Sequence, residues 1–158
     1  MAIYLKYASI KGPVTTDGFK DWIECSSFQW GVSRNIGTAQ RNSTSREHAE
    51  PVISEITVTK QSDIASPKLF LDSVAGKLDS KVTIKFTTTT KGKVDTFSTF
   101  DLEGVGLAHY HMSSGGDMPT ESLSLNFTKI SYTFIGMDPT VSGSPETVGY
   151  ELTQMKTI

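Results

Sequence analysis

Apolar and polar residues alternate most regularly over residues 120–137. Leu125 and Phe127 hold one phase of the alternation, and Tyr132 and Phe134 hold the opposite phase. A period of two is typical of a β-strand, and an extra residue near position 128 is typical of a β-bulge. The pattern therefore predicts one long bulged strand that forms the common wall of a curled or doubled sheet.

Similar alternation recurs along most of the chain and predicts a mainly β fold. Residues 21–31 place Trp22, Phe28 and Trp30 on one face of another strand and Cys25 on the opposite face. Further strand-like segments cover residues 3–7, 52–60, 82–90, 94–102, 105–112 and 150–155. Strands of this kind, joined by turn-forming residues, favour a small two-sheet β-barrel or sandwich.

One segment carries the signals of an α-helix. Pro67 suits the first helical position, Gly76 suits the stop, and Asp63 or Ser66 suits the N-cap. The predicted helix covers about residues 67–75 and is too short to be stable alone in water. We therefore expect it to dock on the sheet. Its apolar side chains form two pairs at helical spacing, Phe70 with Val74 and Leu71 with Ala75.

We expect the core to contain side chains from the strands and from the helix. Its candidate residues are Trp22, Phe28, Trp30, Phe70, Leu125, Phe127, Tyr132 and Phe134. We expect Cys25 to be an inert buried thiol, because its neighbours on the strand are apolar.

Residues 33–51 form a long polar stretch. An uncommitted loop of this length is uncommon in a compact domain and is usually either functional or disordered. Both interpretations stay open at this stage. Its charged and titratable residues include Arg34, Arg41, Arg46, Glu47, His48 and Glu50.

Length and charge limit the classes of protein to which the chain can belong. The chain has 158 residues, which suits one domain over residues 1–158. Its 15 basic and 17 acidic residues give a net charge of -2, so no basic footprint for nucleic acid is present. The start of the chain has no Sec-type signal pattern, and there is no apolar run of membrane-spanning length. We expect synthesis in the cytoplasm and no membrane insertion.

Two pairs of residues raise the question of catalysis. His109 and His111 share one side of a strand and could bind a metal, but a third ligand is needed and His48 lies in a distant loop. Asp101 and Glu103 also share a side, yet neighbours on one strand do not flank a substrate as glycosidase carboxylates do. We therefore expect no metal, no cofactor and no enzymatic activity.

Five segments stand out by their order and spacing along the chain. They are Trp22-Ile23-Glu24, Phe28-Gln29-Trp30-Gly31, Thr57-Val58-Thr59-Lys60, Asp63 with Ser66-Pro67, and Glu121-Ser122-Leu123-Ser124-Leu125-Asn126-Phe127-Thr128-Lys129-Ile130. Together they resemble the Hcp (haemolysin co-regulated protein) family, the tube proteins of bacterial type VI secretion. The resemblance is lowest over residues 33–51 and at the turns near Lys91 and Ser113.

The resemblance implies a specific structure and role. It implies a two-sheet β-barrel with one helix at its side, which forms a homohexameric ring with a wide lumen and has no catalytic site. It also implies stacking of rings into a tube that a contractile sheath ejects, with a spike, a baseplate and lumenal effector proteins as partners. Residues 33–51 would then protrude toward a neighbouring subunit or ring. This makes their charged residues the candidates for ring or tube assembly.

Two other hypotheses belong to different classes. The chain could be a monomeric β-sandwich that binds glycans on Trp22 or Trp30. It could also be a metal-dependent enzyme built around His109 and His111.

Overall fold

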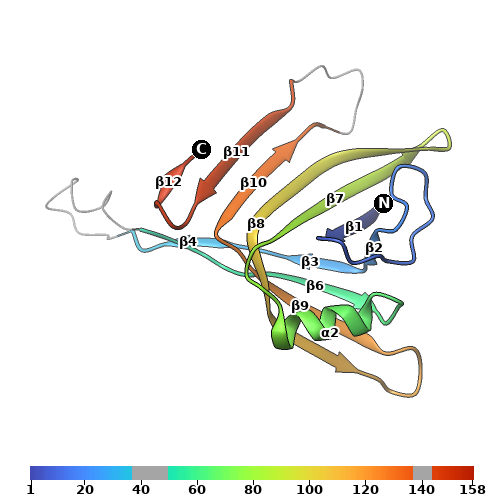
Figure 1. The fold of residues 1–158 in the computed structure, drawn as a ribbon. Helices are drawn as coiled ribbons and strands as arrows, with labels where there is room; N and C mark the ends of the chain where they lie inside the picture. The colour runs from blue at the N-terminus through green and yellow to red at the C-terminus, as the bar shows by residue number, and fades with distance from the viewer. Residues whose placement is uncertain (37–49, 137–143) are drawn as a thin grey trace, which may run out of the picture.

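The computed structural model describes residues 1–36, 50–136 and 144–158 (Figure 1). In these ranges the fold is mainly β with the ten-residue helix α2 (Ser66–Ala75), as the sequence predicts. The strands are β1 (Ala2–Tyr7), β2 (Ile23–Cys25), β3 (Ser27–Gln29), β4 (Val32–Arg34), β5 (Pro51–Ile53), β6 (Ile56–Gln61), β7 (Ser80–Thr90), β8 (Lys93–Ser113), β9 (Thr120–Asn126), β10 (Lys129–Phe134), β11 (Glu146–Glu151) and β12 (Lys156–Thr157).

Two antiparallel sheets share strand β8. The first sheet has the order β12-β11-β10-β8-β7-β1-β2, and the second has the order β3-β6-β9-β8. The first half of β8 pairs with β7 and β10, whereas its second half, from Gly106 to Ser113, pairs with β9. The pairings in the described ranges do not close the two sheets into a barrel. Strands β4 and β5 form a separate pair that leads away from the sheets (Figure 1).

The long strand that the sequence predicts near the C-terminal end is not a single strand in the structure. Residues 120–134 form two strands, β9 and β10, because the chain leaves the second sheet after Asn126 and joins the first at Lys129. The Thr128 amide between them donates to the Glu103 carbonyl oxygen at 3.0 Å. The predicted slip near position 128 is therefore a change of sheet. The 21-residue strand β8 is the wall common to both sheets. The alternation pattern predicts two separate strands here, over residues 94–102 and 105–112.

A change of pairing partner also divides two other predicted strands. Residues 21–31 contain β2 and β3, with a break at Ser26, whose amide donates to the Thr59 carbonyl oxygen at 2.7 Å. Residues 52–60 contain β5 and β6. Part of the predicted loop over residues 33–51 is β-structure, because β4 pairs with β5, while residues 37–49 lie outside the described ranges.

The core fills the space between the two sheets. Leu125 and Phe127 are buried in it, and Phe28, Trp30 and Tyr132 pack against it while partly buried. Trp22 packs instead against a smaller cluster formed by Tyr4, Val14 and Phe19.

Two core candidates lie on the surface. Phe134 is 45% exposed at the end of β10, and Phe70 is 57% exposed on α2. The helix has nearly the predicted bounds, but it docks through Ala65, Ser66 and Leu69, all of which are buried. Its N-cap is Ala65, not Asp63 or Ser66. The Ser66 hydroxyl is turned toward the sheet, where it contacts Lys60 and Glu121.

We predict that Gly104→Ala is more destabilising than Gly92→Ala. Both glycines have positive φ, at +64° and +78°, so both variants lose about 1 kcal/mol or more from backbone strain. A Cβ at Gly104 would also overlap the Thr128 hydroxyl where β8 changes sheet, whereas the same atom at Gly92 meets open space. Overpacking adds about 1–3 kcal/mol. Urea unfolding measures the difference, and equal losses would contradict it.

Candidate functional site

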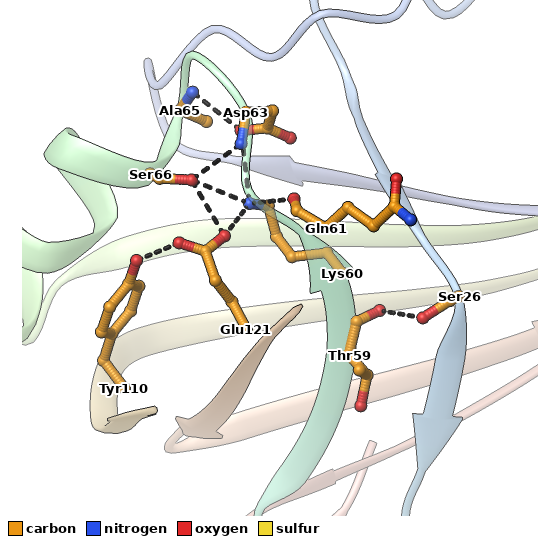
Figure 2. Close-up of polar contacts among 9 residues, drawn as sticks. All are labelled: Ser26, Thr59, Lys60, Gln61, Asp63, Ala65, Ser66, Tyr110 and Glu121. Carbon is orange, nitrogen blue, oxygen red and sulfur yellow. Dashed lines mark hydrogen bonds and ion pairs between the residues drawn. The ribbon is translucent and has the colours of Figure 1, made fainter. Parts of the chain in front are cut away.

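A buried ion pair lies where helix α2 meets the second sheet (Figure 2). Lys60 ends the buried phase of β6, after Ile56 and Val58, and Glu121 begins the buried phase of β9, before Leu123. The two are register partners on adjacent strands, and both side chains are 0% exposed. Alternation therefore directs a cation and an anion into the core at the same point.

Lys60 is surrounded by oxygen atoms. Its Nζ pairs with Glu121 and donates to the Gln61 carbonyl oxygen at 2.9 Å and to Ser66 Oγ at 3.2 Å. Asp63 Oδ1 lies 3.3 Å away. These contacts give the buried ammonium group the partners that it needs away from water.

Glu121 joins three further elements. Its carboxylate accepts hydrogen bonds from Lys60 on β6, from the Ser66 hydroxyl at 2.9 Å and from the Tyr110 hydroxyl on β8. The network thus fixes the first turn of α2 to β6, β9 and β8 (Figure 2). Since Lys60 and Glu121 have no access to solvent, the geometry supports a structural role that orients the helix.

We predict that Tyr110 makes the protein sensitive to alkali. Burial and the hydrogen bond to Glu121 raise the pKa of Tyr110 to about 12, from 10.0. A raised pKa in the folded state means that the stabilisation is complete below pH 10 and is lost as the pH rises toward 12. In Tyr110→Phe, the free energy of unfolding should therefore fall less steeply over that range.

Urea titrations from about pH 9 to 12 measure this slope for both proteins. Tyr7→Phe is measured in the same way for comparison, because burial and the hydrogen bond to Asp72 also raise the pKa of Tyr7. An unchanged slope in Tyr110→Phe would contradict the assignment to Tyr110.

The face of the second sheet that points away from the core is polar. Its side chains form two rows across the four strands, because the strand registers align them. The rows are Gln29, Thr57, Ser124 and His109, and Ser27, Thr59, Ser122 and His111. We call these eight residues the polar face. Hydroxyl, amide and imidazole groups on this face can exchange hydrogen bonds with water or a passing chain.

The two histidines lie at one end of the polar face. Their rings are stacked, with centroids 5.9 Å apart, and both residues are exposed. In the described ranges, no group of three or more His, Cys, Asp or Glu side chains is arranged to bind a metal. His48 lies outside those ranges. Among the residues that the structure describes, none is placed as a third ligand beside His109 and His111.

The two carboxylates of the acidic pair on β8 each contact a neighbouring strand. Asp101 accepts a hydrogen bond from the Thr83 hydroxyl at 2.8 Å, and Glu103 lies 4.0 Å from Lys129 Nζ. Both carboxylates are exposed and are paired across the sheet with neighbouring strands.

Both tryptophans are partly buried and pack against aromatic neighbours. The Trp22 ring packs edge-on against Phe19, and Lys85 Nζ lies 5.6 Å from its centroid. The Trp30 ring packs edge-on against Phe100 in the core. Cys25 is buried, and burial raises the pKa of its thiol to about 12.

The assembly candidates are divided between described and undescribed residues. Arg34 ends β4 and Glu50 precedes β5, and both are exposed. They lie at the base of the predicted loop. The remaining candidates, Arg41, Arg46, Glu47 and His48, lie outside the described ranges.

The family follows from a match that covers most of the chain. A family model described as "Type VI secretion system effector, Hcp" matches residues 4–134. The chain belongs to the Hcp family. Hcp proteins are the tube proteins, also described as effectors, of type VI secretion, so the resemblance drawn from the sequence is confirmed. None of the curated proteins matches the chain significantly.

Solved Hcp structures share the fold. A type six secretion system protein superposes with a TM-score of 0.89 at 24% identity, covering 99% of both chains. Hcp1 from Salmonella typhimurium gives 0.75 at 18% identity, covering 99% of this chain and 98% of that one. A variant of Hcp1 from E. coli EAEC 042 gives 0.76 at 18% identity, covering 96% and 99%. No described helix here is long and apolar enough to cross a membrane.

Proposed function

We propose that this chain is the repeating subunit of a type VI secretion tube. Six copies form a ring, the rings stack into a tube, and a contractile sheath ejects the tube with a spike at its tip. The copies are made in the cytoplasm and leave the cell as part of the ejected tube. Membership of the Hcp family supports this role, and the shape of the second sheet is the observation that carries it.

The second sheet has two free edges in the described ranges. Strand β3 pairs only with β6, and the segment of β8 from Gly106 to Ser113 pairs only with β9. Free edges of this kind can accept another strand. Because the two edges differ, β8 of one copy beside β3 of the next is a head-to-tail contact, which closes into a ring when the rotation is suitable.

The polar face suits the inner wall of such a ring. If the second sheets of six copies form the wall, their eight-residue polar faces line the lumen. Hydroxyl and amide groups can replace the water around a passing effector protein, and they present no large apolar surface on which it could stick. The pair β4-β5, with Arg34 and Glu50, would carry the loop to the adjacent ring.

The solution mass tests this proposal. Light scattering of the purified protein should give about six times 17.2 kDa, and negative-stain images of the same peak should show rings with an open centre. A monomer that persists over a wide concentration range would contradict the proposal, because the free edges would then have no partner.

A further inference from the structure

Helix α2 presents an apolar surface to solvent. Its core-facing side is already occupied by Ala65 and Leu69, yet five large apolar side chains in and beside the helix are each 57–75% exposed. They are Ile64, Phe70, Leu71, Val74 and Leu78. We call these five residues the helix patch. Monomeric soluble proteins rarely expose a contiguous apolar area of this kind, and such areas mark interaction sites.

Three residues of the helix patch lie on one arc of the helix, and one of them contacts strand β8. At 100° per residue, Phe70, Val74 and Leu71 fall on one arc of the helix, away from Leu69. The Phe70 ring also lies edge-on to the Tyr110 ring of β8, with centroids 6.1 Å apart. Tyr110 belongs to the segment of β8 whose outer edge is free. The patch therefore lies beside one free edge of the second sheet.

An apolar groove lies at the end of β3, the strand that carries the other free edge. It has a volume of about 270 Å³ and an almost entirely apolar lining. One wall comes from the register partners Val32 and Ile53 of the β4-β5 pair, and another from Tyr132 and Val148 of the β10-β11 pair. Trp30, which follows directly after β3, also lines it. We call this the Trp30 groove.

From this placement we infer that the helix patch of one copy docks into the Trp30 groove of the next copy. The inference rests on the proposed ring, and it adds the pair of surfaces that closes it. Joining β8 of one copy to β3 of the next brings the helix patch and the Trp30 groove to the same junction. Docking buries two apolar surfaces that the single chain leaves exposed.

A second copy fits better than the other occupants. The patch is convex and the groove is concave, and they lie on different parts of the same chain, as a heterologous contact requires. Contact of the patch with itself would be twofold and would end at a dimer. The groove could instead hold an effector, or the patch could bind an unrelated protein. In either case, substitutions on these two surfaces would not change the contacts between the copies in the ring.

Cross-linking between introduced cysteines tests the contact. The double variant Val74→Cys/Val148→Cys places one thiol on each surface, and the buried Cys25 thiol stays unreactive because its pKa is raised. A short bis-maleimide should join the copies into a ladder of covalent oligomers that extends to six. The matched control is Val74→Cys/Val52→Cys, because Val52 is 67% exposed on β5 but does not line the groove.

The outcomes separate the inference from the proposed function. A ladder in the first variant alone supports the contact. A hexameric wild-type protein without a ladder, or a ladder of equal yield in the Val52 control, overturns the contact and leaves the ring intact. A dimer from Val74→Cys alone shows contact of the patch with itself and also overturns it. A monomeric wild-type protein overturns both.

Charged variants provide a second measurement. Val74→Glu should reduce the ring fraction at least tenfold at a concentration where the wild-type protein is hexameric, because docking would bury an unpaired carboxylate. Val52→Glu should leave the ring fraction unchanged. Both positions are exposed, so both variants should fold, which circular dichroism verifies. A hexameric Val74→Glu protein would overturn the inference.

Discussion

Replacing Lys60 by methionine is expected to lower the free energy of unfolding by about 3–5 kcal/mol. The methylenes of the side chain remain, but the Glu121 carboxylate loses its cation while it stays buried. Hydrogen bonds from Ser66 and Tyr110 to Glu121 remain and offset part of the loss. Urea unfolding of the single variant measures the effect, and a loss below about 1 kcal/mol would show that water reaches the carboxylate.

The double variant Lys60→Met/Glu121→Leu distinguishes the cost of an unpaired charge from the value of the pair. Replacement of a buried ion pair by apolar residues of similar volume is often neutral or stabilising. We therefore expect the double variant to be more stable than Lys60→Met alone. Equal losses in the two variants would mean that the pair contributes a net stabilisation that apolar packing does not replace.

Leu69→Ala is expected to lower the free energy of unfolding by about 2–5 kcal/mol, the usual range for a fully buried leucine. Leu69 is 0% exposed and is the apolar side chain of α2 that enters the core. Leu71→Ala removes the same atoms two residues later, from a side chain that is 63% exposed. It should change the stability of the monomer by less than about 0.5 kcal/mol.

Thermal or urea unfolding of both variants, at a concentration below that of assembly, makes the comparison. A large loss in Leu71→Ala under these conditions would mean that the exposed side of the helix contributes to the fold of the single chain. In that case the helix patch would not be available to a second copy.

The helix illustrates what the sequence could predict. Pro67 and Gly76 gave its position to within about a residue, because these residues act locally through φ and the missing amide. The prediction of Phe70 as a core residue, made because it is apolar, is wrong, since Leu69 enters the core instead. The local sequence pattern of an apolar residue that binds a partner is the same as that of an apolar residue in the core.

The strands show a second limit. Alternation gave the positions of most strands, but it could not show that β8 continues through Gly104 or that the chain changes sheet at Ser26 and Thr128. Those features depend on pairing between segments far apart in the sequence. The Lys60–Glu121 pair was missed for the same reason, as its members are 61 positions apart. A charged residue in the buried phase of each strand was the available signal.

The long separations between paired strands also govern how the chain folds. Ala2 pairs with Thr87, and Ile56 pairs with Leu125, so neither sheet is complete until most of the chain has left the ribosome. At about 5–20 residues per second, translation exposes β1 for several seconds before β7 emerges. Contacts of this kind slow folding. Nascent copies on one polysome therefore carry unpaired strand edges close together, and a chaperone that keeps them apart would raise the yield of correctly folded protein.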